Sequence, residues 1–377
     1  MRVAKTETLI VGAGPAGLAM AGQLSHKKLP FTIIEASDRI APSWHQHYDR
    51  LHLHTVNQWS HLPHLPFPKD FPLYVPKLKL IEYLNSYAAE FKINPIFNQT
   101  VGSINKENDV WTVKTQDTIY IAKSLVIASG VNRVASIPVW EGMDKFKGEV
   151  LHSRFYRNGK AYARKRALVV GMGNTGAELA LDLSEHKAIT FISVRSPISV
   201  VPRDLNGRPV QVTSKQLEKL PFGIGRWLGG KIRKIYFGDL TKYGLPLSDV
   251  DPVKQLLETG KTPVIDIGTI AAIKKEKIKV KPTIDHFTAD TAVFSDGSEE
   301  KLDFVLLATG YKAKVEEFFP AAKAILDGKG LPKSPKGDGV LEGSYFLGFD
   351  NYKLGGILGT ICDDSQLIAD SIEDGFN

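Results

Sequence analysis

The sequence predicts an α/β protein built from two Rossmann-like dinucleotide-binding domains. Two glycine-rich loops lead to this prediction, Gly12-Ala-Gly14-Pro-Ala-Gly17 and Gly171-Met-Gly173-Asn-Thr-Gly176. Each loop follows an apolar run, at residues 8–11 and 167–170, and precedes a helical pattern. In such a unit the first glycine permits the turn, the second lets the backbone approach a pyrophosphate, and the third allows close helix packing. We therefore expect one dinucleotide at each loop.

The residues that follow each loop indicate which dinucleotide it binds. The apolar run 31–34 ends in Glu35, about 20 residues after the first loop, where an acidic residue accepts ribose hydroxyls of FAD or NAD. The matching run 189–194 ends in Arg195, followed by Ser196. A guanidinium fits a 2′-phosphate, and a charge-assisted hydrogen bond of about 1.5–3 kcal/mol favours NADPH over NADH. The alternative is that Arg195 only solvates the end of a strand.

Composition limits the class of protein. A chain of 377 residues with 43% hydrophobic and 24% charged residues can form two cores and gives no sign of disorder. Cys362 is the only cysteine, so no intrachain disulfide can form, and we expect a cytoplasmic protein. The N-terminus superficially resembles a signal peptide, but the first glycine loop explains it better. No apolar run approaches the roughly 20 residues of a membrane-spanning helix.

Charge and histidine content indicate which ligands to expect: anionic cofactors, but neither nucleic acid nor a metal. The formal charge of +7 favours anionic ligands such as NADPH. We expect no nucleic acid, because no basic helix carries stacking aromatic residues. His52 and His54 would share one face of a strand, but no cysteine or paired carboxylate completes a set at zinc-like spacing. We therefore expect no metal.

The chain order predicts a discontinuous first domain. The proline-rich stretch 62–76 is expected to be extended, either as a wall of a ligand channel or as a rigid connector. A helix is predicted over 78–91, and a hairpin of 111–114 with 118–121 ahead of a strand at 125–128. Ser129-Gly130 and Thr309-Gly310 are interpreted as crossovers between domains. The FAD domain then comprises 1–156 and 306–377, with an NADPH domain inserted at 157–305.

Several motifs resemble those of class B flavin-dependent monooxygenases. The stretch Phe146-Lys-Gly148-Glu-Val-Leu-His152-Ser-Arg-Phe-Tyr156 resembles the FxGxxxHxxx(Y/F) fingerprint of this family, and 308–311 resembles its ATGY motif. Baeyer–Villiger relatives usually have Trp in place of Tyr156. Within the class, the chain is most similar to the plant YUCCA branch and its bacterial look-alikes. Six segments spread over the chain support this similarity: 48–54, 62–68, 148–152, 200–203, 260–268 and 278–280.

The resemblance implies an FAD- and NADPH-dependent monooxygenase that forms a flavin C4a-(hydro)peroxide and converts indole-3-pyruvate to indole-3-acetate. Two segments depart from the plant pattern, 221–236, which is shorter and more basic, and 348–359. Alternatives are an N- or S-oxygenating flavin-containing monooxygenase, an NADPH dehydrogenase directed at quinones, and a non-catalytic flavoprotein. A disulfide reductase of the same build needs a cysteine pair, which this chain lacks. Expected partners are O2 and a small-molecule substrate, and a homodimer is left open.

Site residues follow from the loops and from the resemblance. The residues assigned to the flavin are Gly12, Gly14, Gly17, Glu35, Ser43, Trp44 and Arg50. Those assigned to NADPH are Gly171, Gly173, Asn174, Gly176, Arg195 and Ser196. Further cofactor contacts are expected from Pro15, Ala16, Ala36, His54, Gly130, Thr175, Ala308, Thr309, Gly310 and Tyr311. The catalytic candidates are His54, in the position of an asparagine in mammalian-type relatives, and the offset Asn57. His152 is expected to have a structural role, linking the domains instead of transferring protons.

Overall fold

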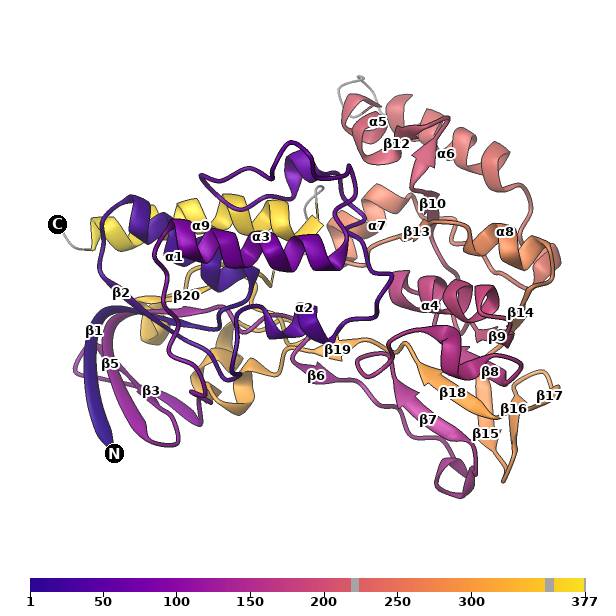
Figure 1. The fold of residues 1–377 in the computed structure, drawn as a ribbon, viewed down its shortest axis with the longest axis horizontal. Helices are drawn as coiled ribbons and strands as arrows, with labels where there is room; N and C mark the ends of the chain where they lie inside the picture. The colour runs from indigo at the N-terminus through magenta and orange to yellow at the C-terminus, as the bar shows by residue number, and fades with distance from the viewer. Residues whose placement is uncertain (218–223, 350–355, 376–377) are drawn as a thin grey trace. The chain divides into compact units, whose positions relative to one another are not determined.

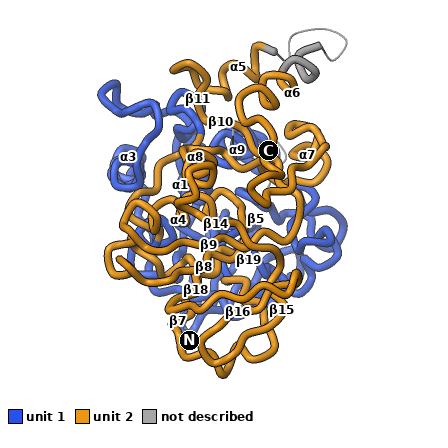
Figure 2. Tube along the Cα trace, turned by 90° about the vertical axis from the view of Figure 1, so that its right-hand side faces the viewer, with its two compact units in different colours: residues 1–46, 55–134, 311–377 blue, residues 47–54, 135–310 orange. Residues whose placement is uncertain are grey.

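The computed structural model describes residues 1–217, 224–349 and 356–375 and divides the chain into two compact units. Unit 1 comprises residues 1–46, 55–134 and 311–377, and unit 2 comprises 47–54 and 135–310 (Figure 2). The chain therefore leaves unit 1 and returns to it twice, once for the short segment 47–54 and once for the long segment 135–310.

A six-stranded sheet forms the centre of unit 1 (Figure 1). Its order is β2-β1-β5-β4-β3, and β20 also pairs with β5. Strands β1, β2, β5 and β20 are parallel, whereas β3, β4 and β5 are antiparallel neighbours. The strands are β1 Arg2–Val11, β2 Phe31–Ile34, β3 Ser103–Glu107, β4 Val110–Lys114, β5 Thr118–Ile127 and β20 Ser344–Phe346. The predicted hairpin is confirmed, but the strand predicted at 125–128 is the continuation of β5.

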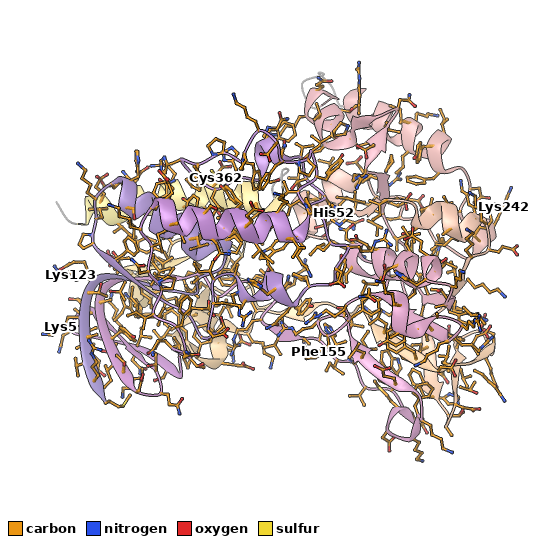
Figure 3. All side chains as sticks on the ribbon, viewed as in Figure 1. Lys5, His52, Lys123, Phe155, Lys242 and Cys362 are labelled. Carbon is orange, nitrogen blue, oxygen red and sulfur yellow. The ribbon has the colours of Figure 1, made fainter. Side chains whose placement is uncertain are left out.

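Helices cover this sheet and bury an apolar core. The helix α1 packs against β1, β2, α3 and α9. One buried cluster includes Leu9, Trp111 and Phe319. The single cysteine, Cys362, is half-buried on α9, and burial raises the pKa of its thiol (Figure 3). The helices are α1 Pro15–His26, α2 Pro42–Gln46, α3 Lys77–Glu90 and α9 Gly356–Asp374, with short 3-10 turns η1 Asn57–Trp59, η6 Val315–Glu317, η7 Pro320–Ile325 and η8 Gly339–Leu341.

The proline-rich stretch of unit 1 is held on α3. The hydroxyl of Tyr83 donates to the Leu65 carbonyl at 2.6 Å and accepts from the Leu62 N–H at 2.8 Å. The ring of Phe67 lies 4.4 Å from that of Tyr83 and 5.7 Å from that of Phe71. These contacts hold an irregular segment that turns back between Leu62 and Leu65, so the prediction that the whole stretch is extended is wrong there. Its proposed role as a channel wall stays a prediction.

A five-stranded parallel sheet forms the centre of unit 2, in the order β14-β9-β8-β18-β7. These strands are β7 Glu149–His152, β8 Arg166–Val170, β9 Ile189–Ser193, β14 Ile278–Lys281 and β18 Phe304–Leu307. The antiparallel strands β15 Ile284–Phe287, β16 Thr291–Phe294 and β17 Glu299–Lys301 form a second sheet. Two strand pairs are separate, the parallel β10 Val200–Pro202 with β13 Val264–Asp266 and the antiparallel β11 Asp204–Leu205 with β12 Arg208–Pro209.

The helices of unit 2 are α4 Asn174–Glu185, α5 Val210–Leu217, α6 Ile224–Phe237, α7 Pro252–Thr259 and α8 Thr269–Lys274, with the 3-10 turns η2 Met143–Lys145, η3 Gly159–Tyr162 and η5 Thr241–Tyr243. The short strands β6 Val134–Ala135 and β19 Tyr311–Lys312 lie where the chain passes between units. The divergent segment 221–236 lies only partly within the described residues, in α6. Likewise, residues 350–355 of segment 348–359 lie outside them.

The unit boundaries differ from the predicted domain boundaries. Unit 2 begins at residue 135 instead of 157, because β7 pairs with β18 in the sheet of unit 2. It ends at residue 310 instead of 305, close to the predicted crossover at Thr309-Gly310. Unit 2 also includes 47–54, which the sequence did not indicate. The assignment of FAD to unit 1 and of NADPH to unit 2 stays a prediction.

Candidate functional site

The first glycine loop has room for a ligand at its middle glycine. A Cβ on Gly12 would lie 2.6 Å from the Ala128 carbonyl oxygen, and one on Gly17 would lie 1.7 Å from the Gly12 oxygen. The fold itself therefore requires those two glycines. Gly14 differs, because its φ of −79° suits any residue and a Cβ there would meet no protein atom within 4 Å. Gly14 precedes α1 without a side-chain cap, so the first N–H groups of the helix suit a pyrophosphate.

Glu35 connects the end of β2 to this loop. Its Oε2 atom accepts the Ala13 N–H at 2.8 Å, and its Oε1 atom accepts the Ser37 N–H at 2.9 Å. A carboxylate has further acceptor capacity on each oxygen, so these bonds leave room for ribose hydroxyls. Ala36 and Ser43 are exposed nearby in sequence, and Trp44 is partly buried on α2. The flavin contacts of these residues, and those of Pro15, Ala16 and Gly130, stay predictions.

The second glycine loop repeats the geometry of the first. A Cβ on Gly176 would lie 1.9 Å from the Gly171 oxygen, whereas one on Gly173 would meet no protein atom within 4 Å. A Cβ on Gly171 would lie 2.9 Å from the Ala308 oxygen, as one on Gly12 would lie against Ala128. In each unit, therefore, the alanine after a neighbouring strand closes on the first glycine. This repetition fits two dinucleotides, each bound by main-chain atoms.

The predicted NADPH residues differ in what they contact. Asn174 accepts the Ile265 N–H through Oδ1 at 2.7 Å and donates to the Pro263 carbonyl at 3.2 Å, so its side chain ties α4 to β13. Arg195 is exposed after β9 and makes no hydrogen bond or ion pair with the described residues. Because β8 and β9 are parallel neighbours, Arg195 and Ser196 emerge at the same sheet edge as the second loop. This placement suits a 2′-phosphate, and the contacts of Thr175 and these residues stay predictions.

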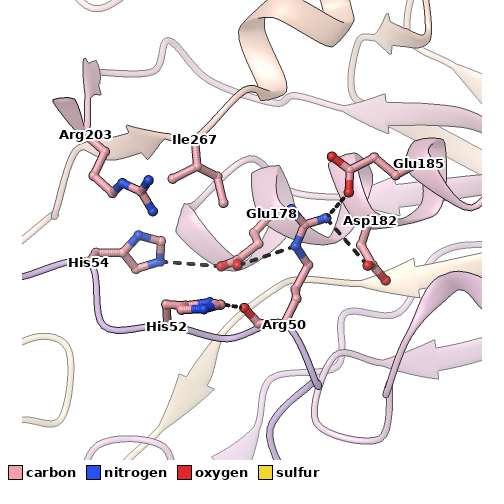
Figure 4. Close-up of a pocket in the computed structure, with 8 residues that line it drawn as sticks. All are labelled: Arg50, His52, His54, Glu178, Asp182, Glu185, Arg203 and Ile267. Carbon is pink, nitrogen blue, oxygen red and sulfur yellow. Dashed lines mark hydrogen bonds and ion pairs between the residues drawn. The ribbon is translucent and has the colours of Figure 1, made fainter. Parts of the chain in front are cut away.

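Unit 2 contains a pocket of about 360 Å³ beside α4 (Figure 4). One wall is segment 47–54, which we call the strap. The opposite wall is formed by Arg203 and Ile267, which follow the parallel strands β10 and β13. The lining residues are Arg50, His52 and His54 from the strap, Glu178, Asp182 and Glu185 from α4, and Arg203 and Ile267. Residues 51–54 form no regular strand, so the predicted shared strand face of His52 and His54 is wrong.

Two buried carboxylates of α4 hold the strap. The side chains of Glu178 and Asp182 are only 3% and 6% exposed, one helical turn apart. Tyr48 donates its hydroxyl to Glu178 Oε2 at 2.7 Å. Arg50 lies 2.7 Å from Glu185, 3.5 Å from Asp182 and 3.8 Å from Glu178. The structure thus gives Arg50 three acidic partners within unit 2, and its predicted flavin contact stays a prediction.

Asp182 also accepts hydrogen bonds from the last residue of the predicted fingerprint and from the turn that follows it. Its Oδ2 atom accepts the Tyr156 hydroxyl at 2.6 Å and the Gly159 N–H at 2.8 Å. Burial, followed by the hydrogen bond to Asp182, raises the pKa of Tyr156, so this hydroxyl stays a donor. The last aromatic residue of the fingerprint therefore stabilises the charge of a buried carboxylate on α4.

The remaining predicted residues fall in separate places. His54 lines the pocket, 3.5 Å from Glu178, whereas Asn57 belongs to unit 1 and donates to the Pro72 carbonyl at 3.3 Å. His152 donates through Nε2 to the Gly310 carbonyl at 3.1 Å, and its Nδ1 accepts the Arg154 N–H at 3.2 Å. Burial lowers the pKa of His152. Both contacts lie within unit 2, and the predicted role of His152 in linking the domains stays a prediction.

Thr309 and Gly310 also connect parts of unit 2, through the hydroxyl of Thr309, which donates to the Ser136 carbonyl, and through the Gly310 carbonyl. The contact of Tyr311 with a cofactor stays a prediction.

Among the described residues, no group of three or more histidine, cysteine or acidic side chains could hold a metal. None of the helices in the described part of the chain is long and apolar enough to cross a membrane.

Comparison with known proteins identifies the family. The family model "Flavin-binding monooxygenase-like" matches residues 5–324. The chain is 37% identical over 372 residues to "Probable indole-3-pyruvate monooxygenase YUCCA4" of Arabidopsis thaliana, covering 97% of this chain and 89% of the relative. It is 35% identical over 384 residues to "Indole-3-pyruvate monooxygenase YUCCA4" of Oryza sativa subsp. japonica, covering 97% and 87%.

Solved structures show the same fold at low sequence identity. A flavin-containing monooxygenase from Stenotrophomonas maltophilia superposes with a TM-score of 0.76 at 16% identity, covering 99% of this chain and all of that one. An oxidized steroid monooxygenase bound to NADP gives 0.75 at 18%, covering 99% and 85%. The bacillithiol disulfide reductase of Staphylococcus aureus gives 0.72 at 17%, covering 99% and 100%.

The fold and the two glycine loops define a flavoprotein with two dinucleotide-binding domains. The chain belongs to the flavin-binding monooxygenase-like family, and within it the chain is YUCCA-like. It is thus a member of an NADPH-dependent flavin monooxygenase family that uses FAD and NADPH. The sequence-based predictions of fold class, enzyme class and cofactors are confirmed.

Proposed function

We propose that this protein converts indole-3-pyruvate to indole-3-acetate by oxidative decarboxylation. The observation that carries the proposal is the 37% identity, over 97% of the chain, to a relative named as a probable indole-3-pyruvate monooxygenase. The overall reaction balances as 2-oxo acid, O2, NADPH and one proton giving the shortened acid, CO2, NADP⁺ and water. The cytoplasmic location and the oligomeric state of the protein stay predictions.

The chain's own residues bind and orient the reactants. The main chain at Gly14 and Gly173 holds the pyrophosphates of FAD and NADPH, because neither position is filled by protein. Arg195 recognises the 2′-phosphate. When bound, FAD would supply the O2-activating chemistry, with NADPH as the electron donor and O2 as the source of the oxygen atom that enters the substrate. His54, the proposed catalytic residue, lines the pocket of unit 2.

Oxygenation of an amine is the second candidate function. The pocket lining contains three carboxylates, Glu178, Asp182 and Glu185, against two guanidinium groups, Arg50 and Arg203. The excess of carboxylates over guanidinium groups favours a cationic ligand over an anionic one. The same pocket therefore suits an alkylammonium substrate, for which the product would be an N-oxide or a hydroxylamine.

Isotope labelling separates these functions. Purified holoenzyme is supplied with NADPH, ¹⁸O2 and either indole-3-pyruvate or a tertiary amine. We expect indole-3-acetate with one ¹⁸O atom in its carboxyl group and one NADPH consumed per product. Turnover of the amine alone would replace the proposed function with the second candidate. NADPH consumption that yields only hydrogen peroxide with every substrate would contradict both.

A further inference from the structure

The end of helix α6 presents an apolar side chain to solvent among lysines. Helix α6, Ile224–Phe237, packs beside α5 at the periphery of unit 2 (Figure 1). Ile235 is 83% exposed and Tyr236 is 50% exposed. Lys231, one helical turn before Ile235, and Lys234 are exposed as well. We call these four side chains the α6 patch. The proposed function leaves this patch without a role.

The opposite face of α6 fixes the orientation of the patch. Phe237 is buried in the core of unit 2. Arg233, one turn before it, donates to the Ser199 hydroxyl and to the Ser248 carbonyl, at 3.4 Å each. Residues four apart share a face of a helix, so Arg233 and Phe237 both turn inward. Ile235, two residues after Arg233, lies on the outward face. The core therefore gives no reason for an isoleucine at this position.

The chain around the patch is strongly basic. Between residues 229 and 244 it carries three lysines and one arginine against one acidic residue, Asp239, which gives a net charge of +3. The carboxylate of Asp239 accepts the N–H and the hydroxyl of Thr241. Lys242 is exposed in the following turn η5 (Figure 3). This charge attracts an anionic partner, and the exposed isoleucine favours a partner with an apolar interior.

We propose that the α6 patch docks on an anionic lipid surface. In this arrangement Ile235 and the ring of Tyr236 enter the boundary between head groups and acyl chains, while the lysine ammonium groups contact the lipid head groups. A helix of 14 residues is too short to cross a bilayer, which takes about 20, so the contact is peripheral and reversible. A nucleic acid would match the lysines but would leave Ile235 in water.

Vesicle co-sedimentation tests the proposal without any turnover. The full-length protein with bound FAD is mixed with vesicles of phosphatidylcholine alone or of phosphatidylcholine with phosphatidylserine. We expect at least about fivefold stronger binding to the vesicles that contain phosphatidylserine. Most of this binding should be lost between about 0.1 M and about 1 M salt, because the Debye length shortens from about 10 Å to about 3 Å. Absence of a preference for the anionic vesicles would overturn the proposal.

Paired lysine variants separate docking of the patch from a general effect of charge. Lys231→Gln combined with Lys234→Gln should weaken vesicle binding about tenfold or more, because each lysine near an anionic surface contributes roughly fivefold. The control combines Lys123→Gln with Lys301→Gln, which removes the same charge from side chains that are 70% and 78% exposed elsewhere. The control should bind within about twofold of the parent protein. Equal losses in both pairs would show that net charge alone attracts the vesicles and would refute the inference.

The apolar side chain provides the second comparison. Ile235→Ser should weaken binding about fivefold or more, because less apolar area enters the lipid. Ile235→Trp should strengthen it, because tryptophan prefers the membrane interface. The control is Val139→Ser, at an apolar side chain of unit 2 that is 89% exposed, and it should leave binding unchanged. Lysine effects without an effect of either Ile235 variant would indicate a surface for any polyanion and would contradict lipid docking.

The folding control uses the same variant. Because Ile235 lies outside the core, the urea midpoint of Ile235→Ser should equal that of the parent protein. Weaker vesicle binding at an unchanged midpoint then belongs to the lost lipid contact. A lowered midpoint would show that Ile235 stabilises the fold, and the exposed isoleucine would no longer support a docking surface.

Discussion

A single guanidinium group is expected to decide which nicotinamide nucleotide unit 2 accepts. Arg195 is exposed after β9, at the sheet edge that carries the second glycine loop. We predict that Arg195→Ala raises the KM for NADPH by about 10- to 100-fold, because about 1.5–3 kcal/mol of charge-assisted hydrogen bonding is lost. The KM for NADH should change less than about twofold. Steady-state kinetics with both nucleotides test this, with the exposed Arg208→Ala as control, and equal effects on both nucleotides would contradict the role.

A buried histidine is expected to make unit 2 sensitive to acid. Burial lowers the pKa of His152 below its ordinary value of 6.5, so the folded protein holds this ring neutral. Above pH 6.5 the ring is neutral in both states, and its contribution to stability is complete. As the pH falls below that value, the unfolded chain binds a proton that the folded chain does not, and stability is lost.

We therefore predict that His152→Gln reduces the drop in the urea midpoint between about pH 7.5 and pH 5.5. The variant should also be less stable at pH 7.5, because the glutamine amide cannot reproduce both hydrogen bonds of the imidazole with the same geometry. Urea unfolding at several pH values measures both effects. His286→Gln is the control, because the His286 side chain on β15 is 38% exposed, and it should leave the pH dependence of the parent protein unchanged. A parental slope in His152→Gln would show that other groups control acid sensitivity.

At the scale of elements, the strap and α4 stabilise each other through charge. Arg50→Ala leaves Glu178 and Asp182 buried without their guanidinium partner. Breaking a fully buried pair costs about 3–5 kcal/mol. Because Arg50 is 26% exposed and two of its three distances are long, we expect a loss of about 2 kcal/mol.

Urea unfolding of Arg50→Ala measures this loss. Arg39→Ala is the matched control, because Arg39 is 54% exposed and pairs only with its neighbour Asp38 among the described residues, so we expect a change within about 0.5 kcal/mol. Adding Glu178→Gln to Arg50→Ala should restore part of the stability, since the unpaired charge is then removed. If Arg50→Ala unfolds like the control, the strap is held by other contacts.

Local signals in the sequence located helices and strands, but they did not show how far a strand continues or which distant segments pack together. The glycine loops and apolar runs located β1, α1, β8 and α4, because glycine at a tight turn and helical spacing act over a few residues. The predicted break after residue 121 is absent, since β5 continues through exposed Lys123 and keeps its pairing with β1. The strap was not predicted, because Tyr48 and Glu178 are 130 residues apart and read separately as ordinary polar positions.

At the scale of the whole molecule, the two units each contain a complete strand–loop–helix cradle. In both cradles the middle glycine, Gly14 or Gly173, has ordinary backbone angles, and a Cβ added there would meet no protein atom within 4 Å. A valine there should therefore let the unit fold and fill only the space of the pyrophosphate. By contrast, Gly17→Val should prevent folding, because its Cβ would lie 1.7 Å from a backbone oxygen.

Two variants test whether the cradles act independently. Gly14→Val should give colourless protein, without FAD, that still binds NADPH in a fluorescence titration. Gly173→Val should give yellow protein with full FAD occupancy and at least about tenfold weaker NADPH binding, since the branched side chain blocks the approach of the pyrophosphate to the main chain. Each variant serves as the folding control for the other, because each keeps the function of the second unit. Loss of binding of both nucleotides in either variant would mean that one cradle depends on the other. Normal binding of both nucleotides would show that the main-chain cradles do not bind the cofactors.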